Sequence, residues 1–436
     1  MELETGNAVL RSEVEATESA AINDSANVKE VNTIVEDIVP NCLRNTFNRF
    51  LDPKHFASFG DTTLENVRTF HKGLPNYKPT PLYSLPALSE KLGIGKILVK
   101  DEGQRFDVNA FKVLGGSYSV ARLLAKEFNL SDDELNLDTI KSKITEPMTF
   151  ATATDGNHGR GIAWAANKLG QKAVIYMPVG TAEERVTNIE NLGADVIVTD
   201  LNYDDTVRMA CEHSEVNGWT YVQDTAWEGY TEIPLWIMQG YTTIVGESVE
   251  QMTEMGVEKP THIILQAGVG SMAGAILAAF GRQYGPDSFK SIIVEPEKAD
   301  CVYRSAMQKD GEIVIVNDML DTIMAGLACG EPSTLGWEIL KANATAFMSC
   351  DDSLAAVGMR ILAAPMAGDP AVTSGESGAI GTGILYALGQ KEEGKQLMEK
   401  LGMDENSVVW VLNTEGNTDP VNYQKVVWEG KFPKAE

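Results

Sequence analysis

The sequence predicts an α/β protein of two lobes, in which parallel sheets lie between helices in a three-layer arrangement. Strand-like and helix-like segments alternate over residues 149–224, and a second alternating unit covers residues 261–296. Because parallel strands need helical crossovers, this rhythm favours two separate parallel sheets. The 436 residues are 43% hydrophobic, which is enough to bury one large core or two linked cores, and we expect two.

Charge and hydropathy narrow the class of partner. A formal net charge of −26 would repel phosphate backbones, so nucleic acid is not expected as a partner. No run approaches the ~20 apolar residues of a membrane span, and the N-terminus has neither an apolar signal core nor an Arg-rich transit pattern. The chain is therefore expected in the cytoplasm, with no membrane partner.

The cysteines and the N-terminal segment suggest no chemistry of their own. Five scattered cysteines include no CxxC pair, so neither a metal site nor a redox motif is expected. Cys301 and Cys329 could meet in space, but the sequence does not decide between a bridge and two thiols. Residues 1–37 carry nine acidic and two basic side chains, and we expect residues 1–40 to be a disordered acidic extension.

The elements of the globular part follow in order along the chain. Proline-rich residues 74–86 should be extended and lead into a strand at residues 96–100, with a helix from about Val113. Charged residues 129–147 should form a solvent-facing helix. The two alternating units come next, and residues 408–416 should add a late strand to the second lobe. We therefore assign a small α/β domain to residues 119–226, and a large domain to residues 41–118 and 227–436.

A glycine-rich loop joins the strand that ends at Gln266 to the next helix. Such a loop presents backbone N–H groups at the positive end of a helix, where they can hold a phosphate. Gly268, Gly270 and Ala273 also fit the dinucleotide fingerprint G-x-G-x-x-A, with Glu295 placed as a ribose-binding acid. An NAD-binding oxidoreductase is therefore an alternative, although a dinucleotide domain usually carries this loop early in its lobe.

A lysine stands in an unusual place, in the segment Asn109-Ala110-Phe111-Lys112 just before a helical pattern. Helix dipoles favour cations at the other end of a helix, so a neutral amine or imine is relatively favoured here. That is the state in which an amine bonds an aldehyde. Taken alone, the position of Lys112 favours a surface lysine beside a helix start.

A second helix start suited to anions has the sequence Thr154-Asp155-Gly156-Asn157-His158-Gly159. Taken singly, these residues have ordinary explanations. Asn157 could be a helix cap, Gly156 a turn residue and His158 a histidine satisfied within its helix.

The order of lysine motif, asparagine loop and glycine-rich loop resembles the fold type II pyridoxal-phosphate enzymes, the family of threonine dehydratase and the tryptophan synthase β chain. The resemblance covers the chain from about residue 45. It implies their two-lobed fold, pyridoxal 5'-phosphate bound by the large domain, and a homodimer. It makes Lys112 the Schiff-base lysine, Phe111 the aromatic residue before it, and Asn157 the partner of the cofactor's 3-hydroxyl. The phosphate is then held by main-chain N–H groups of Gly268, Val269, Gly270, Ser271 and Met272.

In the same family a hydroxyl residue near the C-terminus faces the pyridine nitrogen, and in the segment LNTEGN this role falls to Thr414. A hydroxyl leaves the ring nitrogen largely unprotonated, which favours β-elimination over transamination.

The segments NAFKVLGGSY, TDGNHGRG, QDTAWEGY, TIMAGLACGEPS and LGWEIL resemble the ammonia-lyases that act on diaminopropionate. Dehydratases of the family usually have Ser where this chain has Asp155. A protonated β-amino group requires a nearby carboxylate, which Asp155 or Asp224 could provide, although Asp224 could equally cap a following helix. A serine or threonine dehydratase and a β-replacement enzyme are the alternatives within the family.

The resemblance implies α,β-elimination of 2,3-diaminopropionate to pyruvate and ammonia. Lys112, displaced from the cofactor by the substrate amine, would remove the α proton of one isomer. Asp155 would be the base for the D isomer, or else an anchor for the ammonium group. Backbone N–H groups of Thr154, Asp155, Gly156 and His158 would hold the substrate carboxylate.

Overall fold

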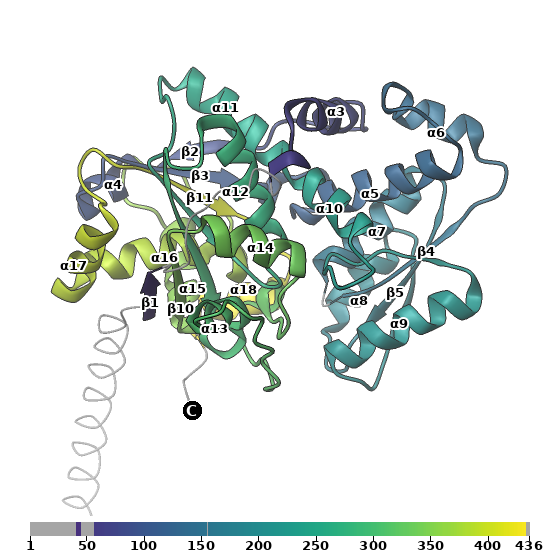
Figure 1. Ribbon diagram of the computed structural model, residues 1–436. Coiled ribbons are helices and arrows are strands. Elements are labelled where there is room, and N and C mark those ends of the chain that lie inside the picture. The colour runs from purple at the N-terminus through teal and green to yellow at the C-terminus, as the bar shows by residue number, and fades with distance from the viewer. Residues whose placement is uncertain (1–40, 45–55, 155, 433–436) are drawn as a thin grey trace, which may run out of the picture.

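The computed structural model describes residues 41–44, 56–154 and 156–432, and it forms two lobes side by side (Figure 1). The acidic extension expected at residues 1–40 lies outside the described residues, and so does Asp155. Each lobe is built on its own sheet, as the two alternating units in the sequence predict.

The larger sheet has seven strands in the order β1-β10-β9-β8-β11-β3-β2. Its five inner strands are parallel, and an antiparallel strand pairs at each edge. The late strand expected near the C-terminus is β11, which lies between β8 and β3. The bounds are β1 Asn41–Arg44, β2 Leu82–Ser84, β3 Lys96–Asp101, β8 His262–Gln266, β9 Lys290–Pro296, β10 Ala346–Cys350 and β11 Val408–Asn413.

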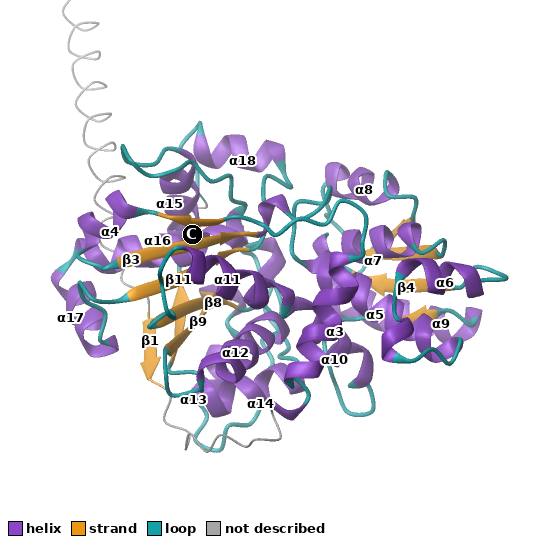
Figure 2. Ribbon diagram, turned by 90° about the horizontal axis from the view of Figure 1, so that it is seen from above, coloured by secondary structure: helices purple, strands orange, loops and turns teal. Residues whose placement is uncertain are grey.

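Consecutive side chains of the inner strands enter two different hydrophobic cores. In β8, Ile263 and Leu265 pack into one core, while Ile264 between them packs into the other. Because side chains alternate across a strand, a strand that is apolar at every position must be covered on both faces. Helices supply that cover, with α15 and α16 on one side of the sheet and α12 and α14 on the other (Figure 2).

The helices of the larger lobe connect its strands and form the outer layers. Single 3₁₀ turns also occur at Glu102–Gln104, Glu297–Ala299 and Ala325–Leu327. The α-helices are α3 Asp61–Lys72, α4 Pro86–Leu92, α11 Thr243–Glu254, α12 Ser271–Tyr284, α13 Cys301–Met307, α14 Thr334–Asn343, α15 Asp352–Ala363, α16 Glu376–Gln390, α17 Glu392–Leu401 and α18 Pro420–Val427.

The smaller sheet has four parallel strands in the order β6-β5-β4-β7. They are β4 Thr149–Ala153, β5 Lys172–Met177, β6 Asp195–Val198 and β7 Thr220–Tyr221. The helices near this sheet are α5 Lys112–Glu127, α6 Leu137–Lys143, α7 Asn157–Lys168, α8 Glu183–Glu190, α9 Tyr203–Asn217 and α10 Glu232–Tyr241.

The continuous helix expected over residues 129–147 is wrong. The segment contains a 3₁₀ turn, Asp132–Glu134, and the short helix α6. Ser131 and Glu134 form a capping box around the turn, and Asn136 then caps α6 by accepting from Thr139 N at 2.9 Å. Each cap satisfies the N–H groups of a helix start, so two short helical segments form in place of one continuous helix.

Within the described ranges, no helix is both long and apolar enough to cross a bilayer. Over the same residues, no group of three or more His, Cys, Asp or Glu side chains is arranged to hold a metal ion. No disulfide joins the five cysteines, so Cys301 and Cys329 are thiols in this structure.

Candidate active site

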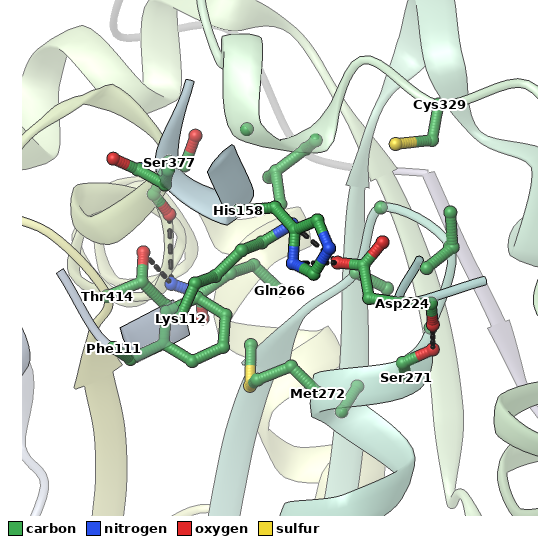
Figure 3. A pocket seen from close by; sticks show the side chains of 18 of the residues that line it. Phe111, Lys112, His158, Asp224, Gln266, Ser271, Met272, Cys329, Ser377 and Thr414 are labelled. Carbon is green, nitrogen blue, oxygen red and sulfur yellow. Dashed lines mark hydrogen bonds and ion pairs between the residues drawn. The ribbon is translucent and has the colours of Figure 1, made fainter. Parts of the chain in front are cut away.

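A pocket lies where the carboxyl ends of β8 and β11 meet the N-termini of α5, α7 and α12 (Figure 3). Helix N-termini carry partial positive charge and unsatisfied N–H groups, so three of them around one pocket favour an anionic ligand. The predicted site residues that line it are Phe111, Lys112, Thr154, Asn157, His158, Asp224, Gly268, Val269, Gly270, Ser271, Met272 and Thr414. Gly156 lines a smaller cavity beside it. Asp155 lies outside the described residues.

Lys112 and Asp224 face each other in this pocket, with Nζ 2.8 Å from Oδ2. Asp224 reaches this position because β7 ends after two residues and the chain then turns away, held by Gln223 N donating to Tyr230 Oη at 2.9 Å. The alternative that Asp224 caps a helix is wrong, because the next helix begins at Glu232.

The carboxyl group of Asp224 is held in its charged form. Burial alone would raise its pKa, but the charges of Lys112 and His158 and the hydrogen bond from Lys112 outweigh burial and lower the pKa to about 2. At neutral pH, Asp224 is therefore a carboxylate and not a proton donor.

Close helix packing fixes the backbone of Lys112. A Cβ atom on Gly161 of α7 would lie 2.8 Å from the Lys112 carbonyl oxygen, so only glycine lets α7 approach the first turn of α5. On the other side, Phe111 N donates to Thr414 O at 3.1 Å, and the Phe111 ring packs on Tyr241 with centroids 4.8 Å apart. The lysine is thus carried by a rigid helix start rather than by a loose loop.

The glycine-rich loop has the geometry of a phosphate cradle. Gly270 has φ +87°, in the left-handed region that favours glycine, and α12 starts at the next residue, Ser271. The Ser271 hydroxyl donates to Asp224 O at 2.7 Å, and Ser333 N donates to Val269 O at 2.8 Å. These contacts hold the loop against the segment that carries Asp224.

Glu295 is not placed to bind a ribose. It is buried, and its carboxylate accepts from Val302 N at 2.9 Å and Tyr303 N at 2.6 Å. It therefore caps the first turn of α13. The glycine loop therefore lacks the ribose-binding acid that a dinucleotide site requires.

His158 combines an ordinary structural contact with an electrostatic one. Its ring is buried, and Nε2 lies 2.9 Å from Val222 O, as in a histidine satisfied within the fold. Its Nδ1 lies 3.9 Å from Asp224 Oδ2. The His158 ring thus lies beside the Lys112 amine and approaches the same oxygen of Asp224 (Figure 3).

The pocket also contains polar residues that sequence reasoning missed. Gln266 donates to Ser377 O and to Leu412 O at 2.9 Å each, and its Nε2 lies 3.4 Å from Thr414 Oγ1. The Ser377 hydroxyl is buried and has no hydrogen-bond partner within the described part of the chain. The hydroxyls of Thr414 and Ser377 are therefore among the groups that line the pocket near Gln266. The glycine-rich helix start SGESGAIG was the signal that could have pointed to Ser377.

These residues together suit an aromatic aldehyde that carries a phosphate. Lys112 provides an amine for the aldehyde, and the α12 loop provides N–H groups for the phosphate. The unpartnered hydroxyl of Ser377 and the neighbouring Thr414 provide polar contacts for a ring nitrogen.

Comparisons with known proteins agree with this chemistry. The family described as "Pyridoxal-phosphate dependent enzyme" matches residues 74–396. The diaminopropionate ammonia-lyase of Escherichia coli K12 is 55% identical over 388 residues, covering 89% of this chain and 97% of the relative. That of Salmonella typhimurium LT2 is 50% identical, covering 84% and 92%. The crystal structure of the holo E. coli enzyme has a TM-score of 0.85 at 54% identity, covering 90% of this chain and 97% of that chain. The structure of the E. coli enzyme in complex with D-serine has the same TM-score, identity and coverage.

Proposed function

The chain belongs to the family of pyridoxal-phosphate dependent enzymes, and we propose that it is a carbon–nitrogen lyase that converts 2,3-diaminopropionate to pyruvate and ammonia. The observation that carries this proposal is the Lys112–Asp224 pair, which places an amine and a carboxylate 2.8 Å apart beside a phosphate cradle. The identity of 55% to an enzyme named for this activity supports the substrate.

The described residues fit pyridoxal 5'-phosphate. Lys112 Nζ would bond its aldehyde, the N–H groups at the start of α12 would hold its phosphate, and Asn157 would contact its 3-hydroxyl. Thr414 would face the pyridine nitrogen, with Ser377 beside it. When bound, this cofactor supplies a conjugated ring that delocalises the charge left on the α carbon after proton removal.

Lys112 then serves as a base. Its Nζ points into the pocket from the fixed start of α5, where it can take the α proton from one face of the substrate. The opposite isomer presents its α proton on the other face, and we assign its removal to Asp155.

Asp224 provides the charge that distinguishes a diamino acid from serine. Its carboxylate lies in the pocket 2.8 Å from Lys112 Nζ, where it can bind a β-ammonium group once Lys112 no longer carries the countercharge. An ion pair of this kind at about 4 Å is worth roughly 4 kcal/mol at an effective dielectric constant of about 20. A neutral β-hydroxyl gains no such attraction. This difference favours diaminopropionate over the hydroxy amino acids of the dehydratases.

The start of α7 completes the site. Backbone N–H groups at its first residues would hold the substrate carboxylate at the positive end of this helix. Thr154 N and Gly156 N, which the sequence suggested for this role, instead donate to Tyr176 O and to Thr154 Oγ1, both at 2.9 Å. The carboxylate and the β-ammonium would then be held at two different points, which sets the orientation of the α carbon.

Pyruvate release with three substrates tests the proposal. Purified protein should release pyruvate from 2,3-diaminopropionate faster than from serine or threonine, and should show the visible absorption band of a lysine-bound cofactor. Lys112→Ala should lose the band and the activity. Faster turnover of serine or threonine would instead identify a dehydratase. A protein that shows no band after incubation with the cofactor would overturn the whole assignment.

The proposal extends to organisation, location and assembly. We place the small domain at residues 119–226, expect the enzyme in the cytoplasm, and expect a homodimer by resemblance to the family. Sedimentation equilibrium of the purified protein tests the dimer, because a mass near 47.3 kDa would correspond to one chain.

A further inference from the structure

Asn157 lies between two cavities. It lines the main pocket, and it also lines a smaller polar cavity on its other side, together with Arg160, Glu376, Glu415 and neighbouring residues. No step of the proposed reaction uses this smaller cavity. Its charged side chains come from α7, from α8, from the start of α16 and from the segment after β11.

Both ends of the Asn157 amide are bound on the side of the smaller cavity. Asn157 Nδ2 donates to Glu415 Oε2, and Arg160 Nη1 donates to Asn157 Oδ1 at 3.4 Å. A carboxylate only accepts hydrogen bonds and a guanidinium only donates them. Flipping the amide would bring two acceptors together and two donors together, so these neighbours select one orientation.

Glu415 is itself held firmly. Its side chain is buried, and Thr418 Oγ1 donates to the same carboxylate at 3.3 Å. Its backbone forms an antiparallel bridge with Ala110, two residues before Lys112, and accepts from Gly375 N at 2.9 Å. The carboxylate that orients Asn157 therefore belongs to the same backbone framework as the lysine.

Charge compensation supports the role of Arg160. Burial lowers the pKa of its guanidinium, the charge of Glu415 acts in the opposite direction, and the positive charge of Arg185 adds to the lowering. The two ions lie on opposite sides of one amide and stabilise each other across it.

We propose that Glu415 and Arg160 are positioning residues that hold the Asn157 amide so that its second N–H is presented to the 3-oxygen of the cofactor. The inference rests on the proposed function, because it assumes that this cofactor occupies the main pocket. Nδ2 has two N–H groups, and one is committed to Glu415. A fixed donor favours the ionised 3-oxygen, the form that absorbs at longer wavelength, whereas a flipped amide would place its own oxygen there and repel that charge.

The test is the visible spectrum of the holoprotein at neutral pH, together with the rate at which it loses cofactor to a competing aldehyde reagent. In Glu415→Ala, we expect intensity to move from the long-wavelength band to a shorter-wavelength band, and cofactor loss to become about tenfold faster, as expected for losing a hydrogen bond to a charged group. Glu415→Gln keeps a side-chain oxygen that can accept from Asn157, so it should restore most of the wild-type spectrum.

Two more variants separate orientation from charge and from misfolding. Glu376→Gln removes a carboxyl from the same cavity without touching Asn157, and its spectrum should match the wild type. Arg160→Met removes the other contact and should shift the bands in the same direction as Glu415→Ala. It therefore tests the inference independently if Glu415→Ala fails to fold. A wild-type spectrum in both Glu415→Ala and Arg160→Met would overturn the inference, as would an equal shift in Glu376→Gln. A wild-type protein without any band would instead overturn the proposed function.

Discussion

The Lys112–Asp224 pair should contribute measurably to the stability of the cofactor-free protein. The structure holds the pKa of Asp224 at about 2, roughly two units below the ordinary value of an aspartate. Each unit corresponds to about 1.4 kcal/mol, so interactions in the folded state favour the charged carboxylate by about 2 to 3 kcal/mol. Both side chains are largely buried, so screening by solvent takes away little of this energy.

The sign of the pH dependence follows from the direction of the shift. The folded pKa lies below the unfolded one, so the contribution is fully present above about pH 4 and is lost as the pH falls towards 2. Between pH 6 and pH 8 it should be constant.

A double-mutant cycle measures the pair without the other effects of each substitution. Urea unfolding at pH 7 of the wild type, Asp224→Asn, Lys112→Met and the double variant should give a coupling of about 0.5 to 3 kcal/mol, the range for residues in contact. The net pKa shift does not equal this coupling, because His158 adds to the shift and burial offsets part of it. Each single variant leaves one buried group without its partner, so the double variant should be more stable than the sum of the single losses predicts. A coupling below about 0.5 kcal/mol, or one that changes between pH 6 and pH 8, would refute the argument.

Three further predictions concern other parts of the chain. Gly270→Ala should lower the free energy of unfolding by about 1 to 2 kcal/mol and also speed cofactor loss. Gly229 has a similar φ of +85° and open space around it, so Gly229→Ala should lower the free energy of unfolding without changing cofactor loss. Burial and a neighbouring carboxylate raise the pKa of Glu376 to about 7. The free energy of unfolding of the wild type should therefore fall by about 2 kcal/mol relative to that of Glu376→Gln as the pH rises from 5.5 to 8. Urea unfolding that gives the same pH dependence for both proteins would contradict this. Glu247→Gln leaves the buried cations Lys100 and Arg105 without full compensation and should lower the free energy of unfolding by about 3 to 5 kcal/mol. Glu250→Gln removes the exposed partner of Arg68 and should cost less than about 1 kcal/mol. Similar losses in both variants would show that burial does not matter here.

The sequence was sufficient to predict the local units of the fold. The alternating segments between residues 149 and 224, and those from residue 261, became two parallel sheets because hydrophobic periodicity is a local property of the chain. The candidate site loops at Lys112, Asn157 and Gly268 were also selected from sequence, since each joins a recognisable turn or strand to a helix start, and the structure brings them to one pocket. The same local reasoning failed at residues 129–147, where two caps override a helical composition.

Contacts between distant parts of the chain were decided only by the tertiary structure. The pairing of Lys112 with Asp224, the capping role of Glu295, and the contact of Asn157 with Glu415 all depend on which strands are neighbours. The insertion of β11 between β8 and β3 brings the segment after Asn413 beside the chain that leads to Lys112. Local patterns determine which segments form strands and helices, but the order of strands in a sheet follows from the best burial of all apolar faces together, and no short stretch of sequence contains that information.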